Sequence, residues 1–99
     1  MAIETKPFDP ADYLDDEESR LEYLRQSFAS GDPADIAEGV GTVARALGMS
    51  RIANEAGLAR PALYRALTEG GNPSLATVAK VLSTMGLRLT VEPARPDAT

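Results

Sequence analysis

The stretch RIANEAGLARPALYRAL, which runs from Arg51 to Leu67, decides the fold of this chain. Its pattern indicates two short helices joined by a tight turn. Ala53 is the small residue required where the second helix crosses the first, and Gly57 tolerates the positive φ of the turn. The apolar residues that fix the pair to a core are Ile52, Leu58, Leu63 and Leu67. The stretch therefore predicts a helix-turn-helix unit.

The outward face of the second helix indicates a binding function. With three apolar residues directed inward, helical periodicity leaves six outside. These are Arg60, Pro61, Ala62, Tyr64, Arg65 and Thr68. Arginine can form a paired contact with guanine or grip a phosphate, and tyrosine and threonine can reach the DNA backbone. The face is typical of a DNA-reading helix; the alternative is a purely structural three-helix core with solvated arginines.

Arg60 stands near the start of this helix, where the helix dipole disfavours a cation by roughly 0.3 to 1 kcal/mol. Stability therefore does not account for Arg60, unless a nearby carboxylate such as Glu55 pairs with it. Ala59 is a poor helix cap, and Pro61 disfavours helical geometry in the residue before it. We therefore predict that Arg60 is itself the cap and that Pro61 is the first helical residue.

Charge is polarised along the chain, although the formal total is -5. Residues 1–42 hold three basic and eleven acidic side chains, whereas residues 43–91 hold six basic and two acidic ones. A change of sign between halves is expected when one part contacts nucleic acid and another faces solvent or a basic partner. The plainer alternative is that the acidic half is only a well-hydrated surface.

Composition excludes several classes of function. The chain has no cysteine and no histidine, which removes disulfides, thiolate nucleophiles, the usual zinc ligand sets and histidine-assisted catalysis. No pair of carboxylates suggests acid–base work, and no glycine loop suits phosphate binding. No run approaches the about 18 apolar residues of a membrane span, and the N-terminus lacks signal-peptide features. We expect a cytoplasmic protein that is not an enzyme, contacts no membrane and needs no cofactor or metal.

Five helices are predicted from caps, apolar spacing and stop signals. They run from the caps Asp15 and Asp16 to near Ser30 and Gly31, from Asp32 and Pro33 to Gly48, from the cap Ser50 to Ala56, from Arg60 or Pro61 to Thr68, and from the cap Ser74 to Gly86. Gly39 and Gly41 lie inside the second helix. Each should weaken it by about 1 kcal/mol relative to alanine, unless close packing requires a glycine.

After the last helix, the sequence LRLTVE from Leu87 to Glu92 alternates as a β-strand does. A lone strand leaves backbone groups unpaired, so it should pair with the N-terminal arm or with its counterpart in a second subunit. In the arm, Phe8, Tyr13 and Leu14 are expected to pack against the body. The predicted parts are an extended arm (1–14), a helix-turn-helix domain (15–92) and a disordered tail (93–99).

Five segments of the chain carry a family pattern. They are FDPADYL in the arm, SFASGDPADIAEGVGTVARALGMS, RIANEAGLARPALYRAL, EGGNPSLATVAKVLSTMGL and the ending RLTV. Together they resemble the Xre-type addiction module antidote proteins of small bacterial toxin–antitoxin modules, which are found beside ParE/RelE-like toxins and in prophages. The most specific part is the stretch LYRAL followed, after one residue, by EGGNP.

The resemblance implies an all-α, five-helix lambda-repressor-like fold, to which the pattern above adds a short C-terminal β-strand. It also implies a homodimer that binds double-stranded operator DNA, represses its own operon and neutralises a cognate ParE/RelE-like toxin. Carried over to this sequence, the DNA-reading positions fall on Arg60, Pro61, Tyr64 and Arg65, with Arg51 and Asn72 as contacts to the DNA backbone. Relatives often have serine or threonine at the position of Ala59. A cap and a phosphate contact are lost there together, so weaker DNA binding is expected.

Two other functions fit the same residues. One is an interaction module whose acidic half covers a basic toxin and whose DNA binding is weak. Charge reversal at six carboxylates would test it: Asp12, Asp15, Asp16, Glu17, Glu18 and Glu22. The other is a stand-alone prophage-type repressor without a toxin, which the identity of the neighbouring gene would distinguish.

Overall fold

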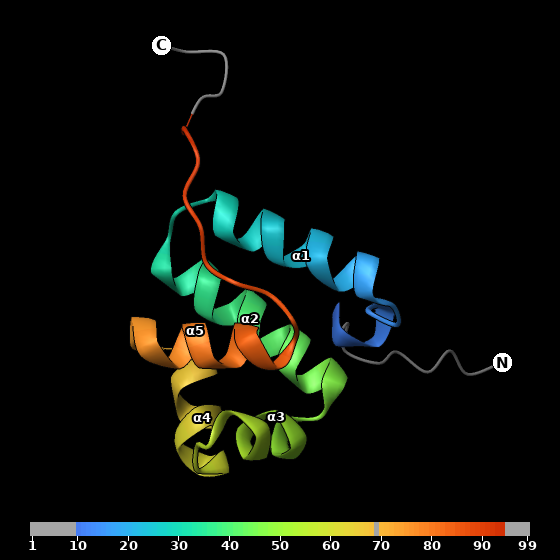
Figure 1. Cartoon of the computed structure of the whole chain (residues 1–99), viewed down its shortest axis with the longest axis vertical. Helices are drawn as coiled ribbons and strands as arrows, with labels where there is room; N and C mark the ends of the chain where they lie inside the picture. Colours follow the sequence, from blue (N-terminus) through green and yellow to red (C-terminus); the bar gives the residue numbers. More distant parts are fainter. Residues whose placement is uncertain (1–9, 69, 95–99) are drawn as a thin grey trace, which may run out of the picture.

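The computed structural model describes residues 10–68 and 70–94, and these form an all-helical arrangement. The elements are the 3-10 helix η1 (Pro10–Tyr13), α1 (Glu17–Ala29), α2 (Pro33–Leu47), α3 (Met49–Ala56), α4 (Arg60–Leu67) and α5 (Leu75–Thr84). The prediction of five α-helices is confirmed. α2 lies in the middle, with α1 on one side and α3 and α4 on the other (Figure 1).

Three of the helices begin at the side-chain caps that the sequence predicts. The Asp16 carboxylate accepts the Ser19 N–H at 2.7 Å, and the Asp32 carboxylate accepts the Ala34 N–H at 2.8 Å. The Ser74 hydroxyl accepts the Thr77 N–H at 3.1 Å. Each contact satisfies a backbone donor that the first turn of a helix leaves without a partner.

Glycine ends α3 and α5 in the same way. Gly57 follows α3 with φ 71°, and the next residue, Leu58, donates its N–H to the Ala53 carbonyl at 2.8 Å. Gly86 follows α5 with φ 75°, and Leu87 donates to the Leu82 carbonyl at 2.9 Å. Both ends are Schellman motifs, in which the left-handed residue is usually glycine because it has no Cβ.

The core forms around α2, whose middle turns are buried on all sides. Its buried residues are Ala37, Gly39, Val40, Gly41, Thr42, Val43 and Ala44. Thr42 is the one buried polar side chain of the described residues, and its hydroxyl donates to the Glu38 carbonyl at 2.9 Å. The other helices pack against this rod with smaller apolar faces.

The two glycines inside α2 have the packing reason that the sequence left open. A Cβ at Gly39 would overlap the side chain of Ser27 on α1, and a Cβ at Gly41 would overlap the backbone carbonyl of Leu67 on α4. The two glycines therefore let α1 and α4 approach α2 closely. Close approach offsets their weak helix propensity.

Two predicted caps are wrong. Ser50 lies in the first turn of α3, whose N-cap is Gly48 without a side-chain hydrogen bond. In α4, Ala59 is the N-cap and Arg60 the first helical residue, with the Leu63 N–H bonded to the Ala59 carbonyl at 2.9 Å. α3 therefore begins two residues earlier than predicted and α4 one residue earlier, and neither helix has a capping side chain at its start.

The predicted strand from Leu87 to Glu92 is also wrong for the single chain. The described residues contain no strand, and only Leu87 of this stretch packs against the core. An alternating pattern becomes a strand only when a neighbouring strand accepts its backbone hydrogen bonds. No element of the described chain supplies that partner.

The described part of the N-terminal arm is not extended. Pro10–Tyr13 forms a 3-10 helix, which corrects the prediction of an extended arm over 1–14. Leu14 is buried as expected, whereas Tyr13 is 67% exposed. Phe8 lies outside the described residues, as does most of the predicted disordered tail, of which the structure describes residues 93 and 94 alone.

Candidate nucleic-acid interface

The helix pair α3–α4 is anchored by a row of fully buried residues. Ile52 and Ala53 of α3 are at most 2% exposed, and Leu63 and Leu67 of α4 are each 1% exposed. These are the positions that the sequence assigned to the core. With both turns of α4 fixed from below, its opposite face keeps one orientation.

Four of the six predicted site residues lie on that opposite face. Arg60, Pro61, Tyr64 and Arg65 are all exposed, and Tyr64 is 48% exposed. Within the described ranges, neither Arg60 nor Arg65 has an ion-pair partner, although Glu69, four residues after Arg65, lies outside those ranges. The face therefore combines two cations, an aromatic hydroxyl and a rigid proline.

Thr68 differs from the outward residue that the pattern predicts. It is half-buried at the end of α4, and its hydroxyl donates to the Arg65 carbonyl at 3.4 Å. The hydroxyl helps to close the helix. It is therefore less available to a ligand than the other residues of the face.

The N-terminus of α4 is open because Ala59 has no capping side chain. Ala59 has φ -71° and ψ 130°, the extended conformation typical of an N-cap. The N–H groups of Arg60 and Ala62 find no acceptor among the described residues, and Pro61 has no N–H. Side-chain patterns alone do not reveal these two backbone donors. The signal for them was the alanine at the cap.

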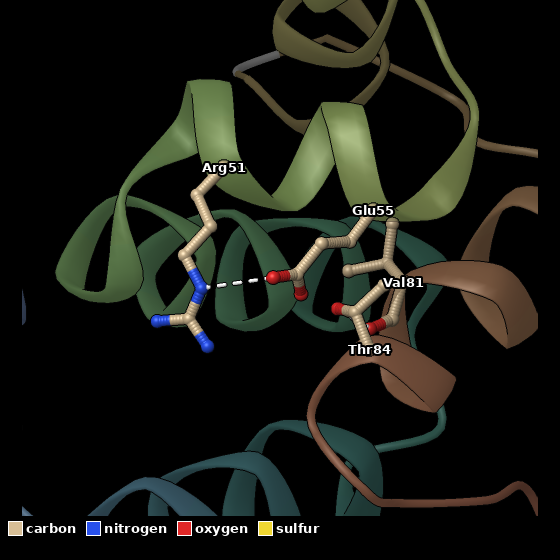
Figure 2. Close-up of polar contacts among 4 residues, drawn as sticks. All are labelled: Arg51, Glu55, Val81 and Thr84. Atoms are coloured by element: carbon tan, nitrogen blue, oxygen red, sulfur yellow. Dashed lines mark hydrogen bonds and ion pairs between the residues drawn. The ribbon is translucent and has the colours of Figure 1, made fainter.

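Arg51 lies on α3, and its guanidinium is held by Glu55. Its Nε donates to the Glu55 carboxylate at 3.2 Å, an i,i+4 pair in which both side chains are largely exposed. Figure 2 shows the two side chains reaching toward one another along α3, with Val81 and Thr84 of α5 nearby. Such a surface pair contributes about 0.3–0.5 kcal/mol. Glu55 therefore pairs with Arg51 and does not neutralise Arg60.

Asn72 is exposed in the loop that follows α4. The loop is drawn tightly against the helix: the Gly71 N–H donates to the Thr68 carbonyl at 2.8 Å, and a Cβ at Gly71 would overlap the carbonyl of Ala66. Close packing of Gly71 therefore holds Asn72 beside the C-terminal end of α4.

The opposite end of the molecule carries the acidic charge. α1 begins with Glu17 and Glu18 and continues with Glu22, all exposed, and it lies across α2 from the α3–α4 pair (Figure 1). A shallow groove of about 210 Å³ lies between α1 and the start of α2. Its lining residues are Tyr23, Gln26, Ser27, Asp35, Glu38 and Gly39. The charge asymmetry of the sequence is thus an asymmetry in space.

In the part of the chain that the structure describes, no cluster of three or more acidic, histidine or cysteine side chains is arranged to hold a metal ion. No helix there is both long enough and apolar enough to cross a membrane.

The chain is similar to known proteins over most of its length. A family model described as "Probable addiction module antidote protein" matches residues 4–93. An uncharacterized protein of Haemophilus influenzae is 39% identical over 95 residues, which is 96% of this chain and 98% of that protein. No solved structure matches the chain.

Proposed function

Because the chain belongs to the family of probable addiction module antidote proteins, we propose that it is an antitoxin that represses its own operon as a DNA-binding homodimer. The family supports a role in a toxin–antitoxin module. We further propose that α3 and α4 form a helix-turn-helix of the Xre type. The partner toxin is then of the ParE/RelE-like kind. It also places the protein in the cytoplasm, without enzymatic activity.

The observation that carries DNA binding is the pair of exposed arginines on a helix fixed by buried leucines. Arg60 and Arg65 point away from the core that holds Leu63 and Leu67. In the major groove a guanidinium can donate two hydrogen bonds to the O6 and N7 of guanine. A helix held rigidly presents the two arginines without an ordering cost for its backbone, so that only the side chains have to be ordered on binding.

Other groups of the site suit phosphate contacts. The two open N–H groups at the start of α4 lie at the positive end of a helix dipole, which favours an anion. The Tyr64 hydroxyl and the Asn72 amide can donate to the DNA backbone, as can the part of Arg51 that Glu55 leaves unbound. Such contacts fix the register of the helix on the duplex, whereas the arginines select the sequence.

A homodimer sets the form of the operator. Two-fold symmetry places two copies of α4 in successive major grooves, about 34–36 Å apart. The operator should therefore be palindromic, with half-sites one helical turn apart.

Fluorescence anisotropy on the DNA upstream of the operon tests this proposal. Arg60→Ala and Arg65→Ala should each lose about 1–3 kcal/mol of discrimination between operator and scrambled DNA. The matched control is Arg25→Ala, which removes one exposed arginine from α1. If both α4 variants bind as the control does, α4 does not read DNA.

The acidic end is the surface that we assign to the toxin. Its carboxylates can steer a basic partner, and α1 presents them away from α4. Reversing Glu17, Glu18 and Glu22 to lysine should abolish neutralisation of the co-expressed toxin and leave operator binding intact. Asp16 is left unchanged because it caps α1. A toxin that stays silenced would show that this surface is only hydrated.

The second candidate function is a repressor without a toxin. The exposed arginine face of α4 favours it as much as it favours an antitoxin, since both read DNA. Purification together with the product of the neighbouring gene distinguishes the two: a stable complex supports the antitoxin.

A further inference from the structure

The segment that follows α5 has no partner within the described chain. The Leu87 N–H is bonded to Leu82, but no backbone group from residue 88 to residue 94 bonds to another described residue. Leu89 is 36% exposed and Val91 is 94% exposed. Figure 1 shows the segment leaving α5 as a drawn-out trace. Such a segment offers free donors and acceptors to another extended chain.

The sequence of the segment is complementary to itself. When two copies run antiparallel with Thr90 opposite Thr90, Arg88 of one copy lies opposite Glu92 of the other, and Leu89 lies opposite Val91. Each of these unlike pairs occurs twice by symmetry. Side chains alternate between faces, so the charged pairs share one face and the apolar pairs share the other.

Hydrogen bonding is consistent with this alignment. In an antiparallel pair, residues alternate between positions that exchange both backbone bonds and positions whose N–H points outward. If residues 88, 90 and 92 are the bonded positions, the outward ones include Leu87 and Pro93. The Leu87 N–H is already used by Leu82, and Pro93 has none. Leu87 and Pro93 therefore suit outward positions, because neither has a free N–H to offer.

We propose that two copies of this chain dimerise by antiparallel pairing of residues 88–92, with Thr90 on the two-fold axis. This inference rests on the proposed function, of which the homodimer is a part, and it names the interface. A second copy is the favoured occupant because each charge meets its opposite. The described structure of one chain contains no ion-pair partner for Arg88 or Glu92.

The interface is small, so the dimer should depend on concentration. Two strands alone are marginally stable in water. The apolar face of the paired strands adds stability. Leu89 and Val91 lie on the same face as Leu87, which packs on the core. Binding to a palindromic operator would strengthen the dimer further by mass action.

Sedimentation velocity over a range of concentrations tests the pairing without DNA or toxin. Arg88→Glu and Glu92→Arg should each raise the dimer dissociation constant about tenfold, since each places two like-charged pairs opposite one another. The double variant should restore the wild-type constant. The matched controls are Lys80→Glu and Glu38→Arg, which change exposed charges elsewhere by the same amounts.

The two single variants separate pairing from general repulsion. The chain has a formal charge of -5, so repulsion alone would make Glu92→Arg dimerise more tightly and Glu38→Arg equally so. A tighter Glu92→Arg dimer, a double variant that fails to recover, or a wild-type chain that stays monomeric would each overturn the inference.

Variants of Thr90 test the backbone hydrogen bonds of the pairing independently of the charges. Thr90→Pro removes the central N–H and should disrupt the dimer, whereas Thr90→Ala keeps that N–H and should not. A monomer whose residue 88–92 amides exchange slowly would assign the segment to its own N-terminal arm and overturn the inference. Toxin neutralisation in the same variants is scored separately. If the pairing fails while neutralisation survives, the antitoxin function stands and only the interface is wrong.

Discussion

The two ends of this molecule are built differently. The acidic helix α1 has one buried residue, Leu24, in thirteen. The basic pair α3–α4 has five in sixteen: Met49, Ile52, Ala53, Leu63 and Leu67. If α4 reads DNA as we propose, it benefits from rigid anchoring, because a small displacement would remove a paired arginine contact. A surface that attracts a partner by charge needs no such precision.

The largest effect should follow from a cavity beneath α4. Leu63→Ala is expected to cost about 2–5 kcal/mol of unfolding free energy, because Leu63 is enclosed by packed neighbours. Leu24→Ala should fall toward the lower end of that range, since α1 rests on α2 with solvent on its other side. Urea denaturation measures both. An equal loss for the two variants would contradict the difference in anchoring.

The glycines of α2 test each end separately. Gly41→Ala forces a methyl group against the Leu67 carbonyl, and backbone cannot rotate away, so a loss of about 1–3 kcal/mol and of operator binding is expected. Gly39→Ala meets the Ser27 side chain instead. The double variant Gly39→Ala, Ser27→Gly should therefore recover stability in thermal unfolding. If Ser27→Gly also restored the stability of Gly41→Ala, the assignment of Gly41 to the contact with Leu67 would be wrong.

The uncapped N-terminus of α4 predicts that a serine at position 59 increases the stability of the protein. Ala59 already has the backbone conformation of a cap, so Ala59→Ser should stabilise the protein by about 0.5–2 kcal/mol. The same change at the exposed Ala29, at the end of α1, is the control and should not stabilise. Unfolding in urea gives both values, and no gain at position 59 would mean that the serine fails to reach the first-turn N–H groups.

The smallest effect concerns the cap of α1. The Ser19 N–H bonded to Asp16 lowers the pKa of that carboxyl below its ordinary value of 3.8, with a lesser contribution from Arg20. A carboxyl whose pKa is lower in the folded state than in the unfolded state stabilises the fold when the pH is above its unfolded-state pKa. This stabilisation is lost as the pH falls through its folded-state pKa. Asp16→Ala should therefore destabilise at pH 7 and matter little near pH 2. Asp15→Ala, which removes a neighbouring carboxylate that makes no cap hydrogen bond, is the control and should cost less stability at pH 7 in urea titrations.

Local chemistry made much of the fold predictable. A carboxylate or hydroxyl three residues before a free N–H, as at Asp16 and Ser74, acts within one turn and needs no distant contact. Gly57 and Gly86 end helices for an equally local reason. The exposure of Arg60 followed from helical periodicity once Leu63 was placed inside.

The sequence by itself thus determined the helices, most of their ends and the charge of each end, because those depend on neighbours along the chain. Only the tertiary structure decided that Ala59 caps α4, that Gly39 and Gly41 admit α1 and α4, and that residues 87–92 form no strand within one chain. Each of these depends on which surfaces meet in space. An alternating pattern or a glycine in a helix has the same local energy whether or not a partner lies against it.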